Sequence, residues 1–71
     1  MKQMKTITEY YGDGDHKGLR SIVEQGDGIY SVAFFKDDKF KGEMMFPDKS
    51  LRYVEDAAEN YTLGILEFNN A

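Results

Sequence analysis

Cysteine is absent from this sequence of 71 residues, so neither a disulfide bond nor a thiolate metal site can stabilise its fold. A chain of this length buries only roughly 60% of the surface that its unfolded form exposes, which leaves a marginal hydrophobic core. Small scaffolds of this kind depend on good packing or on self-association. The lack of cysteine also agrees with a reducing compartment, and we expect a cytoplasmic protein.

Long apolar runs are absent as well. No run approaches the roughly 18 to 20 apolar residues that span a bilayer, and no signal-peptide core follows Met1, so we expect no membrane partner. Positive charge is in short supply: 9 Lys and Arg residues against 13 Asp and Glu residues give a net charge of −4 at pH 7. An acidic chain is not attracted as a whole to a phosphate backbone, which disfavours nucleic acid as a partner.

Groups suited to catalysis are few. His16 is the single histidine, and no serine has the sequence context of a nucleophile elbow. The glycine-rich segments match neither a phosphate-binding loop nor a dinucleotide fingerprint. We therefore expect no enzymatic activity, no catalytic residue and no cofactor.

The loop that begins at Asp13 matches part of an EF-hand calcium loop. Counted from there, Asp15 and Glu24 stand at positions three and twelve, and Gly18 stands at position six. Lys17, however, places a cation where an oxygen ligand belongs, and the flanking segments have the pattern of strands. A polar turn is the favoured interpretation and no metal site is predicted; whether Asp13 and Asp15 bind any cation stays open.

The clearest pattern lies in the C-terminal third, where a start signal, helical spacing and a stop signal agree. Asp48 or Ser50 can cap the first turn of a helix, and Gly64 can adopt the left-handed conformation that closes it. Between them, apolar residues recur with the 3-4-3-4 spacing of one helix face, widened by Ala57. The sequence therefore predicts an amphipathic helix over about 50–63. Its apolar stripe consists of Leu51, Val54, Ala58, Tyr61 and Ile65.

Upstream segments rich in β-branched and aromatic residues have the pattern of strands. Asp27 between two glycines, and Asp37-Asp38 between two lysines, are typical of tight hairpin turns. Sequential strands usually pair, so we expect one α+β domain over 1–71: an antiparallel β-meander of three to four strands with one C-terminal helix packed across one face. The predicted strands cover about 4–11, 18–25, 29–36 and 39–46; whether 4–11 and the tail 65–68 form strands stays open.

Strict alternation along the strands assigns side chains to the two faces of this sheet. In the first strand it places Ile7 on the face opposite Thr8 and Tyr10. The helix is expected to cover Tyr30, Val32, Phe34, Phe40, Met44 and Phe46. The uncovered face is expected to carry Ala33, Phe35 and Met45, with Ile22 beside them.

Residues 30–37 read Tyr-Ser-Val-Ala-Phe-Phe-Lys-Asp, and residues 53–65 contain Glu-Asp-Ala-Ala-Glu-Asn before an aromatic residue and Leu-Gly-Ile. With these segments, residues 29–65, about half of the chain, resemble small accessory proteins of T4-like marine phages, of the cyanophage type. The resemblance implies a phage or marine metagenomic origin, and hence the host cytoplasm as the location. No activity is assigned to that group, so the resemblance implies none here.

Aromatic residues are abundant: five Tyr and five Phe are more than a monomer of this size hides in one core. We therefore expect a non-enzymatic protein–protein interaction module that forms a homodimer. A host or phage protein is a further partner that the sequence leaves open. The expected contact residues are Phe35, Met45 and Ala33 on the outer sheet face, and Glu55, Asp56 and Glu59 on the acidic outer face of the helix.

The alternative is a small nucleic-acid-binding protein. Lysines around the second hairpin, with Phe35 and Phe40 nearby, can contact phosphates and stack on bases. Nearby Asp and Glu residues nearly cancel this charge, which makes nucleic acid the less favoured partner. The candidate contacts are Lys36, Lys39, Lys41 and Lys49.

Overall fold

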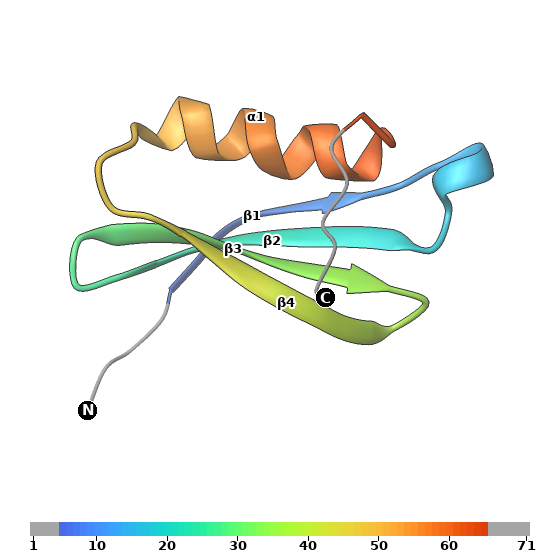
Figure 1. Ribbon diagram of the computed structural model, residues 1–71, viewed down its shortest axis with the longest axis horizontal. Coiled ribbons are helices and arrows are strands. Elements are labelled where there is room, and N and C mark those ends of the chain that lie inside the picture. Colours follow the sequence, from blue (N-terminus) through green and yellow to red (C-terminus); the bar gives the residue numbers. More distant parts are fainter. Residues whose placement is uncertain (1–4, 66–71) are drawn as a thin grey trace.

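The computed structural model of the protein describes residues 5–65, which form a four-stranded antiparallel sheet crossed on one face by a helix (Figure 1). The strands lie side by side in sequence order. The predicted α+β meander with one C-terminal helix is therefore confirmed. Residue 4 of the first predicted strand and residues 66–68 of the tail lie outside the described residues. The elements are β1 (Lys5–Tyr11), the short 3-10 helix η1 (Gly14–His16), β2 (Leu19–Gly26), β3 (Ile29–Lys36), β4 (Lys39–Phe46) and α1 (Leu51–Thr62).

Two tight turns connect the last three strands. Asp27 and Gly28 join β2 to β3 with φ angles of 55° and 77°. Asp37 and Asp38 join β3 to β4 with φ angles of 53° and 65°. Two successive residues with positive φ give a hairpin turn whose twist matches that of the strands, and aspartate tolerates this conformation better than most residues.

The start of α1 follows from one capping residue. Of the two candidates, Ser50 is the cap: its Oγ accepts a hydrogen bond from the backbone N–H of Tyr53 at 3.2 Å. This bond satisfies one of the amide groups that the first helical turn leaves without a partner.

The end of α1 follows from Gly64, which has a φ of 79°. Its N–H donates to the carbonyl oxygen of Tyr61 at 3.1 Å, and the N–H of Ile65 donates to that of Asn60 at 2.9 Å. These two bonds are those of a Schellman motif. Ile65 therefore lies beyond the helix and is 71% exposed, so its expected place in the apolar stripe is wrong. Thr62, which the pattern did not include, is buried instead.

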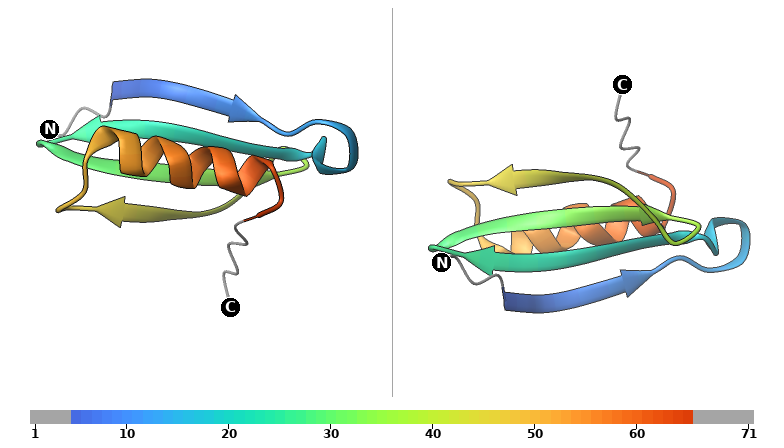
Figure 2. Two further views of the ribbon diagram at one scale, coloured as in Figure 1. Left: turned by 90° about the horizontal axis from the view of Figure 1, so that it is seen from above. Right: turned by 90° about the horizontal axis from the view of Figure 1, so that it is seen from below.

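The core lies between α1 and the sheet. α1 packs mainly over β2 and less extensively over β3 and β1, which leaves β4 at one side of the helix (Figure 2). The ring centroids of Phe34 and Tyr61 are 4.7 Å apart, and the Oγ of Ser21 donates to the carbonyl oxygen of Ala58 at 2.7 Å. The buried cluster consists of Val23, Val32, Phe34, Phe46, Val54, Ala58 and Tyr61.

Two irregularities in the strand register correct the expected faces. A shift between Thr6 and Thr8 turns Ile7 toward the core, so its predicted place opposite Thr8 is wrong. A second shift, between Phe34 and Phe35, pairs Phe35 with Phe40. Such shifts are β-bulges, in which one extra residue reverses the alternation that follows it.

Phe40 consequently lies on the face away from α1, and the expectation that the helix covers it is wrong. Its side chain is 61% exposed. Met44 does lie on the helix side, but it is 39% exposed because α1 lies mainly over β2 and covers little of β4. The edge strand β4 is therefore the least covered part of the sheet.

Candidate interaction surface

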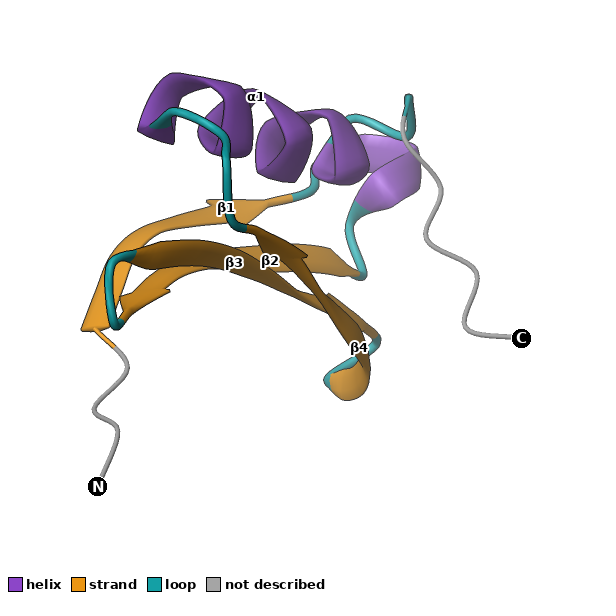
Figure 3. Cartoon of the chain, turned by 60° about the vertical axis from the view of Figure 1, so that its left-hand side comes forward, coloured by secondary structure: helices purple, strands orange, loops and turns teal. Residues whose placement is uncertain are grey.

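The sheet face turned away from α1 is the candidate functional surface, and we call it the open face (Figure 3). The antiparallel register aligns its side chains in rows that cross all four strands. The aromatic row contains Tyr11, Arg20, Phe35 and Phe40. The central row contains Glu9, Ile22, Ala33 and Glu43, and the acidic row contains Thr6, Glu24, Ser31 and Met45.

Arg20, Phe35 and Phe40 contact one another in turn along the aromatic row. The Cζ atom of Arg20 lies 4.3 Å from the centroid of the Phe35 ring. The Phe35 and Phe40 rings meet nearly edge to face, with centroids 5.6 Å apart and an interplanar angle of 64°. Both contacts are favourable arrangements of a cation or a ring edge against an aromatic face. Within the described residues, the buried Nε of Arg20 has no hydrogen-bond partner.

Tyr11 ends the aromatic row on the edge strand β1. Its hydroxyl donates to Oε1 of Glu9 at 2.6 Å. This hydrogen bond raises the pKa of the Tyr11 phenol, because it favours the protonated form. The side chain is nevertheless 64% exposed.

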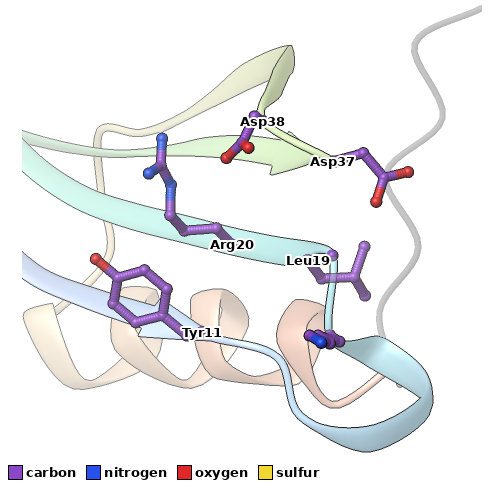
Figure 4. Close-up of a pocket in the computed structure, with 7 residues that line it drawn as sticks. Tyr11, Leu19, Arg20, Asp37 and Asp38 are labelled. Atoms are coloured by element: carbon purple, nitrogen blue, oxygen red, sulfur yellow. The ribbon is translucent and has the colours of Figure 1, made fainter.

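A hollow of about 400 Å³ lies at the end of the aromatic row, beside the turn between β3 and β4 (Figure 4). In Figure 4, Leu19 and Arg20 leave β2 on opposite sides, and the carboxylates of Asp37 and Asp38 point in different directions. The hollow therefore has a mixed lining with no dominant charge. Its lining residues are Tyr11, Lys17, Gly18, Leu19, Arg20, Asp37 and Asp38.

Two carboxylates dominate the far half of the open face. The pKa of Glu24 is raised, first by partial burial and then by the negative charge of Glu43. The Oγ of Ser31 donates to Oε2 of Glu43 at 3.3 Å. Negative charge thus gathers near the acidic row, whereas the cation of the aromatic row, Arg20, lies at the opposite end of β2.

The structure brings the three predicted sheet contacts to the open face. Met45 is 51% exposed and Phe35 is half-buried. Ala33 is buried, because its short side chain lies at the floor of the face. Of the three, Met45 and Phe35 are the ones that a partner can touch directly.

The predicted acidic helix residues do not form one free patch. Oε2 of Glu55 accepts a hydrogen bond from Oγ1 of Thr8 at 2.7 Å, which ties it to β1. Burial, followed by the negative charges of Glu55, Glu59 and Asp56, raises the pKa of Tyr10. Asp56 lines a separate hollow of about 350 Å³, together with Tyr53, Ala57, Asn60 and Ile65.

The four lysines of the alternative prediction divide between two places. Lys36 and Lys39 pair across the end of the β3–β4 hairpin, and Lys41 follows in β4; all three are exposed. Lys49 lies elsewhere, with its Nζ 4.8 Å from the centroid of the Tyr53 ring at the start of α1. Lys36 and Lys39 stand in the row of Leu19, which packs against the core, so they lie on the helix side of the sheet and not beside the aromatic row.

In the loop with the partial calcium motif, Asp13 caps the short helix η1. Oδ1 of Asp13 accepts a hydrogen bond from the N–H of Gly14 at 2.9 Å and caps η1. Asp15 and His16 are exposed, whereas Glu24 lies on β2 in the acidic row. Over residues 5–65, no group of three or more His, Cys, Asp or Glu side chains is placed to hold a metal ion.

No helix in this part of the chain has the length and apolar character needed to span a bilayer.

Sequence reasoning missed the importance of Arg20 and Glu24 on this surface. The signal was present, because the alternation of the second strand places both on the face opposite Leu19 and Val23. Which residues lie beside Arg20 and Glu24 on the adjacent strands, however, follows only from the register of the strand pairs.

No protein-family model, no curated protein and no solved structure matches this chain. The resemblance to phage accessory proteins gains no support from them and stays a prediction.

Proposed function

We propose that the protein is a non-enzymatic interaction module that acts by protein–protein contact and self-associates through its open face. The observation that carries the proposal is the set of large apolar side chains exposed on this one surface. Tyr11, Phe40 and Met45 are 64%, 61% and 51% exposed, and they lie in the aromatic and acidic rows. Aromatic residues and methionine are the types enriched in the centres of protein interfaces.

The energetics favour covering this face. Burial of apolar surface contributes roughly 25 cal/mol per Å², and a sheet face presents its side chains as one continuous layer. Two such faces stack at a distance of about 10 Å, which removes both layers from water at once. A second copy is a suitable partner, because the open face offers both cationic and anionic groups for pairing.

The test is the mass of the protein in solution, measured by light scattering after size exclusion. Phe40→Lys places a charge at the β4 end of the aromatic row, against Phe35, and is expected to shift a dimer to a monomer. Leu63→Lys is the matched control, because Leu63 is 53% exposed at the end of α1, away from the open face. The proposal is wrong if the wild type is monomeric at about 100 μM, or if both variants keep the wild-type mass.

A second candidate function is binding of single-stranded nucleic acid. The observation that favours it is the guanidinium of Arg20 stacked on Phe35, beside the exposed ring of Phe40. Lys39 and Lys41 on the same hairpin can contact phosphates, although Asp37 and Asp38 oppose them. Fluorescence anisotropy with an oligonucleotide at low salt tests this function. Binding that Lys39→Glu and Lys41→Glu abolish, and that Lys49→Glu leaves unchanged, supports it; no binding at about 50 mM salt excludes it.

A further inference from the structure

The charges of the open face are ordered along the strands. Arg20 stands in the aromatic row of β2, and Glu24 stands four residues further along the same strand, in the acidic row. Four residues of a strand span about 13 Å, and Arg20 lies over Phe35 rather than along β2. One end of β2 therefore presents a cation and the other an anion. Such a surface is complementary to a copy of itself turned end for end.

Two orientations are available when identical sheets stack face to face about a two-fold axis. An axis along the strands places like rows against like rows, which puts Arg20 of both copies at one end of the interface and Glu24 of both copies at the other. Partial burial, and after it the negative charge of Glu43, already raises the pKa of Glu24, so further negative charge beside it is unfavourable. An axis across the strands instead reverses the rows, which brings opposite charges together.

We propose that two copies stack their open faces about a two-fold axis across the strands, so that the aromatic row of each copy lies over the acidic row of the other. This arrangement rests on the self-association proposed above. Each strand then lies over the same strand of the other copy. Arg20 on β2 therefore lies over Glu24 of the partner subunit. The arrangement places Phe40 over Met45 of the partner subunit, a sulfur–aromatic contact of the kind that stabilises interfaces.

The central row supports the close approach of the sheets. Ile22 and Ala33 meet their own counterparts at the axis, and the small, buried Ala33 leaves room for the sheets to approach. Glu9 and Glu43 also meet their counterparts, but both lie exposed on the edge strands β1 and β4, where water screens the repulsion. Glu43→Gln is therefore expected to tighten the dimer about two- to five-fold, by removing a screened like-charge contact.

Charge reversal tests the arrangement. Arg20→Glu alone and Glu24→Arg alone each place like charges together, and each is expected to weaken the dimer at least ten-fold. An equimolar mixture of the two variants restores both pairs, because every Glu at one position then meets an Arg at the other. Native mass spectrometry of the mixture is expected to show heterodimers and few homodimers. Arg52→Glu is the control, because Arg52 is exposed on α1.

Cross-linking gives a second measurement that does not depend on charged variants folding. The arrangement places Tyr11 over Thr6 of the partner subunit, at the rim of β1. Because the chain has no cysteine, Tyr11→Cys and Thr6→Cys each introduce a single thiol. A short bismaleimide is expected to cross-link a mixture of these variants much faster than either variant alone.

The outcomes separate the two proposals. A monomeric wild type overturns self-association and the arrangement together. A dimer that Phe40→Lys disrupts, but in which the charge variants do not recombine and each cysteine variant cross-links to itself, overturns the arrangement alone. Heterodimers in the mixture and cross-links only between different variants establish the reversed rows.

Discussion

The guanidinium carbon of Arg20 lies 4.3 Å from the centre of the Phe35 ring, across the pair formed by β2 and β3. This contact holds the cation against the Phe35 ring on the open face. A cation–π contact at a partly exposed site contributes about 0.5–1 kcal/mol. We expect a double-mutant cycle with Arg20→Met and Phe35→Leu to give a coupling of this size in urea unfolding. A coupling near zero would show that the two side chains are merely adjacent.

The hydroxyl of Ser21 joins α1 to the sheet. Ser21 is fully buried, and its Oγ donates to the carbonyl oxygen of Ala58 at 2.7 Å. Ser21→Ala removes this bond and is expected to lower the free energy of unfolding by about 0.5–1.5 kcal/mol, as measured by urea titration. Thr6→Ala, at an exposed position of β1, should change it far less.

Gly64 is required by its backbone conformation. Its φ is 79°, and a Cβ atom there would lie 2.2 Å from Cε1 of His16. Gly28 has a similar φ of 77° but no heavy atom within 4 Å of such a Cβ, which makes it the matched control. Gly28→Ala is expected to cost about 1–2 kcal/mol through backbone strain alone. His16 is exposed and its ring can move aside, so Gly64→Ala is expected to cost about the same as Gly28→Ala in a thermal melt; a much larger loss would show that the ring is held in place.

Glu24 should make the stability of the monomer depend on pH. Burial and the charge of Glu43 raise its pKa in the folded state above the ordinary value of 4.5. The folded state therefore favours the protonated form of Glu24. The resulting contribution to the free energy of unfolding is complete below that ordinary value and is lost as pH rises through the raised folded pKa. In the Phe40→Lys background, Glu24→Gln should gain stability relative to its parent between about pH 4 and pH 7. A difference that stays constant over this range would contradict the prediction.

The order and approximate bounds of the elements followed from local chemistry. The helix spacing from Leu51 to Tyr61, the Ser50 cap and Gly64 each act within a few residues, so the sequence contains the information directly. The Asp37-Asp38 turn is local in the same sense. A pattern of this kind therefore predicts where α1 and the hairpins lie.

The open face was harder to predict, because it depends on register. The bulge between Phe34 and Phe35 moves Phe40 from the helix side to the open face. Gly42, with a φ of 151°, was the one sequence signal of this irregularity, since glycine inside a strand often marks a bulge. The contacts of Arg20 with Phe35 and of Glu43 with Ser31 join different strands, and no local pattern specifies them.

The most direct test of the account is the solution mass of the wild-type chain, measured by light scattering over a range of concentrations. The account predicts a mass that approaches twice the chain mass of 8.2 kDa as concentration rises, and a fall to the chain mass in Phe40→Lys. A wild-type mass that stays at 8.2 kDa throughout would contradict the claim that the open face binds a second copy.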